Sequence, residues 1–484
     1  MRSVKKILDN RAWLLAGILI AVIAIRLITM GFYPLFDDTE SRYAEIARKM
    51  VETGIWVMPQ YHYGVPFWAK PPLSTWSSAA TMLVFGINEF AVRLPSFIYS
   101  IGMFWLVYAL AFKRGGRNYA LASSIVLWTT PVFFVISGGV MTDPALVFST
   151  TLAMAAFWNA ISGSDKKRVW AYVFFIALGI GLLAKGPVAI VLTMFPIGLW
   201  VLWKKKIREA WDGLPWIKGS ILMLAIAVPW YIAAEIYSPG FLKYFLIGEH
   251  ILRFVDSNWH GDKYGYAHPT FRGAIWLYWL AATLPWGIIF IIALLKDKSK
   301  GSGIAKDGWG SYMLLWALTP MIFFTLAGNI IWTYVLPGMP AFSLLLGEII
   351  SKDTDDRRVR RLMLPAGLLL PVCFAAIVVF GRPLQAFKCQ KDEVEAYYRH
   401  RPSPECKLVY LFNKPYSAGF YSGGKAILAP NLKTAKMFLQ PGAPNFFVFQ
   451  KGDSLPKYLK DRLSLVHEYG KFQLFEGKPL NQPF

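Results

Sequence analysis

Repeated runs of apolar residues constrain the fold of this chain more than any other feature. Hydrophobic residues make up 55% of its 484 positions. They fall in runs of about 20, the length that a helix needs to cross a hydrocarbon core of about 30 Å. The runs lie near 12–30, 94–112, 119–136, 143–162, 170–184, 187–203, 216–236, 274–294, 311–328, 331–349 and 362–380. We therefore expect an all-α polytopic membrane domain at 1–380, with about eleven spans and up to 13.

Basic links between these runs predict the topology. The links are KRGGR (113–117), SDKKR (164–168), KKKIR (204–208), KDKSK (296–300) and DDRRVRR (355–361). The positive-inside rule places such links in the cytoplasm, and an eleven-span topology satisfies all of them. The net charge of +22 is concentrated in these links, so it does not indicate a nucleic-acid-binding protein. An extra crossing at 73–86 would invert every later link, so we expect a juxtamembrane or re-entrant helix there.

This topology leaves the polar segments of interest on the periplasmic side of a bacterial inner membrane. The first run follows a basic start and lacks a small-x-small cleavage site, so we expect an uncleaved anchor with a cytoplasmic N-terminus. The outer face then carries the loops 31–93 and 237–273. It also carries short links around Asp143, Lys185 and Asn329.

The composition changes after residue 380. The apolar runs stop, and short strand-like pieces (LVYLF, KAILA, NFFVF and FQLFEG) alternate with Gly and Pro turns. We expect a small α/β periplasmic domain at 381–484. Two of the three cysteines, Cys389 and Cys406, lie in this tail, where an oxidising compartment would favour a disulfide between them.

Acidic residues cluster directly after the first run, in FDDTESRYAEIARKMVETG. Asp37, Asp38 and Glu40 precede a helix whose apolar face we expect to lie in the membrane interface. A capping box would use one or two of these acids, and three exceed that need. A fourth acid, Asp143 in MTDPAL, has the form of an N-cap followed by proline at the first helical position.

Basic residues stand at the predicted outer membrane edge near these acids. Lys70 in FWAKPP and Lys185 in LLAKGP are suited either to snorkelling or, together with Arg42, to clamping a phosphate. His250 and Arg253 in GEHILRF would, in isolation, be ordinary interface residues.

Six of these segments follow one another in a recognisable order: DDTESRYAEI, FWAKPPL, MTDPAL, LLAKGP, GEHILRF and WTYVLP. The series resembles the bacterial aminoarabinose transferase and protein mannosyltransferase family. The resemblance implies a GT-C fold and transfer of a sugar from a polyprenyl (undecaprenyl) phosphate to an acceptor such as lipid A or a protein hydroxyl. It also implies a set of site residues. The catalytic carboxylates would be among Asp37, Asp38, Glu40 and Asp143, and the substrate contacts would be Arg42, Tyr43, Lys70, Lys185, His250, Arg253 and Tyr334.

The chain departs from the family pattern at three places. Ala69 stands where aminoarabinose-type relatives have an acid before the lysine, which counts against a metal site shared with His250, so we expect that no metal or other cofactor is required. Asn329 lies in a segment where those relatives carry lysines. Thr39 occupies the position of a key aspartate in some relatives, so the choice among the first-loop acids stays open.

The function expected from the sequence is that of a hexosyl- or pentosyltransferase acting on the outer face, with lipid A as the acceptor. The alternatives are a protein or polysaccharide acceptor, or a transporter that binds polyprenyl phosphate. A transporter would need ionisable residues at mid-membrane and paired broken helices, and neither is evident. The expected partners are the lipid-linked donor, the acceptor and membrane lipids, without nucleic acid, and the protein is expected to act as a monomer.

Overall fold

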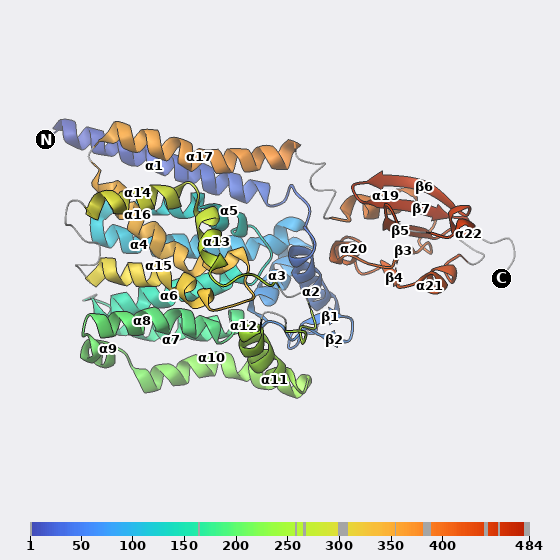
Figure 1. Cartoon of the computed structure of the whole chain (residues 1–484), viewed down its shortest axis with the longest axis horizontal. Helices are drawn as coiled ribbons and strands as arrows, with labels where there is room; N and C mark the ends of the chain where they lie inside the picture. The colour runs from blue at the N-terminus through green and yellow to red at the C-terminus, as the bar shows by residue number, and fades with distance from the viewer. Residues whose placement is uncertain are drawn as a thin grey trace.

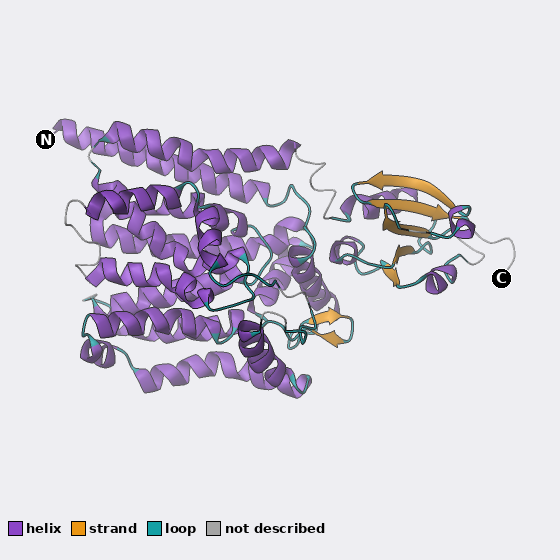
Figure 2. Ribbon diagram, viewed as in Figure 1, coloured by secondary structure: helices purple, strands orange, loops and turns teal. Residues whose placement is uncertain are grey.

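The computed structural model consists of a helical bundle joined to a smaller domain built around a β-sheet (Figures 1 and 2). It describes residues 2–162, 165–256, 259–264, 268–298, 308–353, 355–380, 389–439, 444–453 and 455–478. The bundle ends at Phe380, and the described part of the tail begins at Cys389.

The bundle consists of helices that run side by side (Figure 1). They are α1 (Arg2–Thr29), α4 (Glu89–Thr129), α5 (Pro131–Ile136), α6 (Asp143–Ile161), α7 (Lys167–Lys185), α8 (Val188–Trp203), α10 (Trp216–Tyr237), α13 (Ala274–Thr283), α14 (Trp286–Lys298), α15 (Gly308–Thr325), α16 (Met339–Lys352) and α17 (Asp356–Phe380). Within the described residues, seven helices are long and apolar enough to cross a membrane, or up to eight if the α13–α14 pair, bent by 103°, is one span. The protein is therefore a multi-pass membrane protein.

Each predicted apolar run falls on helical structure, although three runs (119–136, 274–294 and 331–349) each extend over two elements. The runs 94–112 and 119–136 both lie wholly or mostly in α4, where Gly115 and Gly116 have non-helical dihedral angles. Gly116 has φ 78° and ψ −168°, a conformation that a residue with a Cβ atom rarely adopts. The basic segment KRGGR therefore breaks α4 into two helical pieces. The total of eleven spans stays a prediction.

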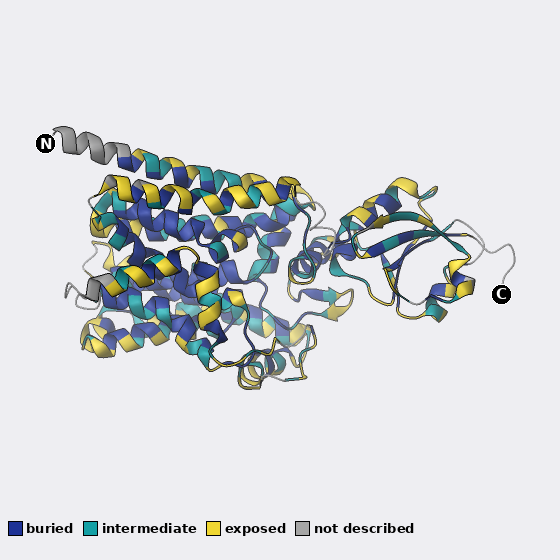
Figure 3. Ribbon diagram, turned by 45° about the horizontal axis from the view of Figure 1, so that its top comes forward, coloured by how far each residue is buried: buried dark blue, intermediate teal, exposed yellow. Residues whose placement is uncertain are grey.

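The surface of the bundle is apolar where lipid would contact it. Exposed side chains on the outer helices include Ile217 and Ile232 on α10, Ile291 on α14, and Leu369 and Val379 on α17. Figure 3 shows this exposed surface along the bundle, with buried residues between the helices. An apolar surface of this extent is unfavourable in water and indicates a bilayer environment.

Short elements gather at the end of the bundle that faces the tail (Figure 1). They are α2 (Thr39–Thr53), the hairpin β1 (Gln60–His62) and β2 (Val65–Pro66), α3 (Leu73–Phe85), α11 (Phe241–Lys243) and α12 (Arg253–Val255). A π-helix, η1 (Tyr244–Leu252), joins α11 to α12, and a 3-10 helix, η2 (Trp332–Gly338), precedes α16. With 13 residues, α3 is too short to cross a bilayer.

The helix α2 differs from the interfacial helix that its sequence predicts. Its apolar face packs against α3 and the chain around Phe67 and Ala91 rather than against lipid. Its polar face is buried too, because α20 of the tail lies against it. Arg48 is 2% exposed and donates to Glu45 and to the Tyr63 hydroxyl. The prediction was wrong because no local pattern indicates that the tail covers this face.

The tail is the α/β domain that its strand-like segments predict. A five-stranded sheet has the order β4-β3-β5-β7-β6, with β3 parallel to β4 and β5 and with β7 antiparallel to β5 and β6. The strands are β3 (Leu408–Leu411), β4 (Ile427–Ala429), β5 (Phe446–Gln450), β6 (Leu463–Tyr469) and β7 (Phe472–Gly477). The helices are α19 (Lys391–His400), α20 (Tyr416–Tyr421), α21 (Leu432–Lys436) and α22 (Lys457–Lys460). The fully buried strand β3 contributes side chains to the apolar cluster on each face of the sheet.

The disulfide expected in the tail is not formed. Cys389 and Cys406 are buried free thiols. Cys389 lies just before α19, whereas the Cys406 carbonyl accepts a hydrogen bond from Tyr397 near the far end of that helix. The helix rise of 1.5 Å per residue puts about 12 Å between Cys389 and Tyr397 along the helix axis. Bridged cysteines have Cα atoms within about 7 Å, whereas Cys389 and Cys406, before and after α19 in the chain, remain separate free thiols.

The topology prediction can be tested by labelling single cysteines with a membrane-impermeant maleimide. Lys433→Cys on α21 and Arg208→Cys on α9 (Ile207–Gly213) both replace exposed basic residues, and they lie at opposite ends of the molecule. We expect intact spheroplasts to label position 433 and to label position 208 only after permeabilisation. The unsubstituted chain corrects for the exposed Cys373. Labelling of position 208 without permeabilisation would overturn the orientation.

Candidate active site

An ion pair joins the ends of two neighbouring helices at the end of the bundle that faces the tail. Asp143 is the first residue of α6 and Lys185 is the last residue of α7, and these helices pack along each other. The Lys185 Nζ lies 3.0 Å from Asp143 Oδ1, and both side chains are largely buried. Asp143 does not act as the expected N-cap, because Thr142 occupies that position and the carboxylate turns to the lysine. Lys185 Nζ also lies 5.0 Å from the centre of the Tyr334 ring.

A second charged group forms around Glu249, which is 8% exposed. Its carboxylate accepts from Lys70 Nζ at 2.8 Å, from Arg253 at 3.3 Å and from the Tyr244 hydroxyl at 3.2 Å. Arg253 also pairs with Asp262 at 3.0 Å. The lysine and arginine charges hold the pKa of Glu249 below its ordinary value, against the effect of burial, so the group is ionised.

The π-helix η1 determines which of its side chains face this group. Its wider turns place Glu249 inward and His250 against the end of α7. The two ring nitrogens of His250 lie 2.8 Å from the Phe245 carbonyl and 3.2 Å from the Lys185 carbonyl. Burial lowers the pKa of His250, so its imidazole is neutral at pH 7.

The residues present do not fit a divalent metal at this position. Both His250 nitrogens face backbone carbonyls, and Ala69 supplies no ligand next to Lys70. Within the described ranges, no group of three or more His, Cys, Asp or Glu side chains is arranged to hold a metal ion. A metal site needs at least three such ligands in most proteins, so we assign no step to a metal here.

Tyr43 on α2 connects the two charged groups. Burial raises its pKa, and the charges that act on it are those of Arg42, Lys185, Asp143 and Glu249. Arg42 donates to the Tyr264 carbonyl and lies 5.4 Å from the Tyr43 ring. Its Nε is buried without an acceptor in the described structure. The guanidinium therefore keeps a donor available for a ligand.

These residues form one site with an excess of positive charge, which we call the charged cluster. Its cations are Lys70, Lys185, Arg42 and Arg253, and its carboxylates are Asp143, Glu249 and Asp262. The structure thus brings together the sequence-predicted residues Arg42, Tyr43, Lys70, Asp143, Lys185, Arg253 and Tyr334, with His250 at its edge. A partly buried excess of cations favours an anionic ligand such as a phosphate.

The three first-loop acids have three different environments. Glu40 receives two hydrogen bonds from Arg93, each of 2.8 Å. Asp37 is held by Ser417 of the tail, whose backbone N–H donates at 2.9 Å and whose hydroxyl also donates. Asp38 stands at the N-cap position of α2, is exposed, and makes no side-chain hydrogen bond to other described residues. Asp38 lies one helical turn before Arg42, so the two residues share a face of α2.

Sequence reasoning missed several residues that build the site. Arg93, Glu249, Asp262, Tyr264 and Ser417 were not among the candidates. Glu249 directly precedes His250 in GEHILRF and stands four residues before Arg253, so an acid next to two predicted site residues was a usable signal. Arg93, Asp262, Tyr264 and Ser417 stand in no recognisable motif, and only the folded chain brings them to the first loop.

The sequence is similar to those of known transferases. A family model described as dolichyl-phosphate-mannose-protein mannosyltransferase matches residues 11–245. The undecaprenyl phosphate-alpha-4-amino-4-deoxy-L-arabinose arabinosyl transferase of Erwinia tasmaniensis is 31% identical over 368 residues, covering 73% of this chain and 62% of that protein. The arabinosyl transferase 1 of Pseudomonas fluorescens is 28% identical over 396 residues, covering 80% and 66%. The chain is similar to aminoarabinose transferases and, over residues 11–245, to the protein mannosyltransferase family model.

Solved structures extend the family's fold to the tail. ArnT from Cupriavidus metallidurans, in its structure bound to undecaprenyl phosphate, superposes with a TM-score of 0.79 at 18% identity, covering 96% of this chain and 98% of that chain. Its apo structure gives 0.78. The sequence matches reach a little under two thirds of the length of the curated relatives named above. The GT-C fold inferred from the motif series is therefore confirmed over nearly the whole chain.

The contact of Asp37 with Ser417 should weaken as pH rises. Burial raises the pKa of Asp37 from its ordinary 3.8 to about 6, although the Ser417 hydrogen bonds act in the opposite direction. A carboxyl that binds its proton more tightly in the docked state favours docking below its raised pKa. This contribution is lost between about pH 4 and pH 6 and is constant above pH 7. Hydrogen exchange of the α20 amides, corrected for intrinsic rates, should increase over that range.

The variant Asp37→Asn should remove this pH dependence, because its side chain does not titrate. The neighbouring Lys391–Glu89 ion pair, at 2.7 Å, provides the comparison, because the pKa of Glu89 is lowered from its ordinary 4.5 by Lys391 despite the opposing effect of burial, whereas the pKa of Asp37 is raised. An equal pH dependence in wild type and Asp37→Asn would assign the effect to another group.

Proposed function

We propose that the protein transfers a sugar from undecaprenyl phosphate to a lipid A acceptor on the periplasmic face of the inner membrane. The observation that carries this proposal is the charged cluster, an excess of partly buried cations beside Asp143 at one end of an apolar bundle. The names of the relatives support the donor, since the arabinosyl transferases are named for undecaprenyl phosphate. The protein would act as a monomer.

The cations of the charged cluster would bind the donor phosphate. Lys70, Lys185 and Arg253 each already pair with a carboxylate, but an ammonium has three N–H donors and a guanidinium has five. Each can therefore contact a phosphate oxygen without leaving its partner. As the bond between the anomeric carbon and the phosphate oxygen breaks, negative charge grows on the leaving undecaprenyl phosphate. Cations fixed in position stabilise that charge more than mobile water does.

Asp143 is the carboxylate that we assign to the reacting centre. Its hydrogen bond to Lys185 fixes it beside a cation that we assign to the phosphate. A carboxylate at this position can orient the acceptor nucleophile, or take its proton if the nucleophile is a hydroxyl. An acceptor phosphate is already ionised and needs little help from a base. Among the described residues no side chain is placed as an evident covalent nucleophile, so a single displacement with inversion is the simplest course.

Among the first-loop acids, we assign a substrate contact to Asp38 and positioning to the other two. Asp38 is exposed and has no side-chain partner in the described ranges, so it is free to meet an incoming acceptor. Glu40 is engaged by Arg93 and Asp37 by Ser417. These two carboxylates hold the loop and the tail in place.

Asp143→Asn should lower transfer by about 10²-fold or more while the protein still inserts. Transfer is measured with purified protein, a radiolabelled undecaprenyl-phosphate sugar and lipid A. Lys185→Met should cause a similar loss, and the double variant should be no worse than the poorer single variant, since the two side chains act as a unit. The matched control is Asp212→Asn, which breaks the exposed pair with Arg208 at the other end of the bundle. Full activity in Asp143→Asn would remove this residue from the mechanism.

The variant Glu40→Gln tests whether Glu40 has a catalytic or a structural role. The buried Arg93 guanidinium would lose its charged partner, so we expect a loss of stability of roughly 3 kcal/mol. Transfer per folded molecule should change less than threefold, which is roughly what a shift of the loop without loss of a reacting group would cause. Thermal unfolding gives the first quantity, and turnover normalised to folded protein gives the second. A large loss of turnover at unchanged stability would return Glu40 to the catalytic residues.

A further inference from the structure

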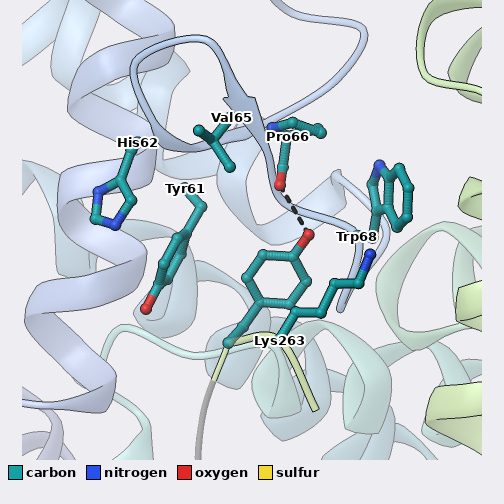
Figure 4. A pocket seen from close by; sticks show the side chains of 7 residues that line it. Tyr61, His62, Val65, Pro66, Trp68 and Lys263 are labelled. Atoms are coloured by element: carbon teal, nitrogen blue, oxygen red, sulfur yellow. Dashed lines mark hydrogen bonds between the residues drawn. The ribbon is translucent and has the colours of Figure 1, made fainter. Parts of the chain in front are cut away.

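A pocket lies between the β1–β2 hairpin and the segment 259–264, outside the charged cluster. Its volume is about 400 Å³, and its walls include Tyr61, His62, Pro66, Trp68, Lys263 and Tyr264. Small-molecule sites commonly measure about 300–1,000 Å³, so the pocket is large enough for a ligand group. Figure 4 shows these side chains around the cavity.

Lys263 provides this pocket with a cation that no acid neutralises in the described part of the chain. Its Nζ lies 4.3 Å from the centre of the Trp68 ring and 5.4 Å from that of Tyr244. The side chain is exposed, and among the described residues it forms no ion pair. In Figure 4 it extends toward Trp68. A lysine held over aromatic faces keeps its three N–H donors for an anion.

The aromatic walls of the pocket are fixed by hydrogen bonds. The Tyr264 hydroxyl donates to the Pro66 carbonyl at 2.8 Å, and the Trp68 Nε1 donates to Ser238 at 2.9 Å. The Tyr61 hydroxyl forms a hydrogen bond with the Tyr416 hydroxyl of the tail. Rings held in this way offer flat apolar faces whose ordering on binding costs little entropy. Such faces suit the C–H groups of a sugar ring.

The pocket borders the charged cluster through shared residues. The Tyr264 carbonyl accepts from Arg42, and the Tyr244 hydroxyl accepts from the Lys263 backbone while it donates to Glu249. A ligand in the pocket would therefore lie next to the reacting centre. The walls come from the hairpin and a loop rather than from a membrane span, so the pocket suits a polar headgroup rather than a polyprenyl chain.

We infer that this pocket binds the acceptor, as the phosphorylated sugar headgroup of a glycolipid. Lys263 contacts the headgroup phosphate, and Trp68 and Tyr61 pack against the sugar. The inference rests on the proposed function and adds to it a separate acceptor subsite. The donor phosphate has its own cations in the charged cluster, so the two substrates would be bound by different cations.

The test measures binding separately from transfer. Full-length protein in nanodiscs is titrated with three probes: lipid A, dephosphorylated lipid A and undecaprenyl phosphate. The variant is Lys263→Met, which removes the charge and keeps most of the side-chain length, and Lys263→Arg restores the charge. The matched control is Lys204→Met, since Lys204 also lies over a tryptophan, with Nζ 5.0 Å from the Trp203 ring, but at the other end of the bundle.

Lys263→Met should weaken lipid A binding about tenfold, and Lys263→Arg should recover most of it. The binding of undecaprenyl phosphate, and the behaviour of Lys204→Met, should not change. With dephosphorylated lipid A the difference between wild type and Lys263→Met should disappear. Unchanged lipid A binding in Lys263→Met would overturn the inference, as would a loss of undecaprenyl phosphate binding instead.

If wild type binds lipid A through Lys263 but transfers no sugar, the pocket assignment is supported and the proposed function fails. If transfer occurs with an unchanged KM for lipid A in Lys263→Met, the function stands and the pocket assignment fails.

Discussion

The buried guanidinium of Arg93 fixes the point at which the first loop leaves the helical bundle. Arg93 has no solvent exposure and donates to the carbonyls of Met30, Tyr33 and Pro34 as well as to Glu40. A turn at the end of a span has carbonyls without helical partners, and a charged donor with five N–H groups satisfies them together. The start of α2 is thereby fixed relative to α4. The positions of Asp38, Arg42 and Tyr43 all follow from that anchor.

The helices and most of the charged cluster could be predicted from the sequence for clear physical reasons. Apolar runs near 20 residues specify spans, and basic links orient them, so the sequence alone assigns Asp143 and Lys185 to the same side of the membrane. Their pairing was not predictable, because it depends on α6 and α7 packing along each other in register. The tail's contacts were missed for a related reason. Ser417 and Tyr416 meet Asp37 and Tyr61 across more than 350 positions, and no local pattern records such contacts. The predicted disulfide was wrong because the cellular compartment and the number of cysteines do not determine which thiols meet in the folded domain.

The contacts of the tail described above are with the first loop and with the start of α4. Ser417 holds Asp37, Lys391 pairs with Glu89, and Tyr416 meets Tyr61 on the hairpin. The Tyr421 hydroxyl also donates to Glu89 and accepts from the Leu35 backbone. Tyr61 belongs to the wall of the pocket, so the tail sets the shape of that wall through one hydroxyl contact. The tail contributes no residue to the charged cluster. It nevertheless restricts the movement of the first loop, which carries the cluster residues Arg42 and Lys70.

The Asp143–Lys185 pair has a consequence that concerns the bilayer itself. The two residues end a hairpin of helices with 19 residues each, and such helices are about 28 Å long at 1.5 Å per residue. That length nearly equals the hydrocarbon thickness of about 30 Å, so the depth of the Asp143 carboxylate in the membrane depends on lipid thickness. A thicker bilayer would draw the charged pair toward hydrocarbon or force the hairpin to tilt less, at a free-energy cost of a fraction of a kcal/mol per Å. The acyl-chain length of the surrounding lipids therefore affects how deep the Asp143–Lys185 pair lies in the membrane.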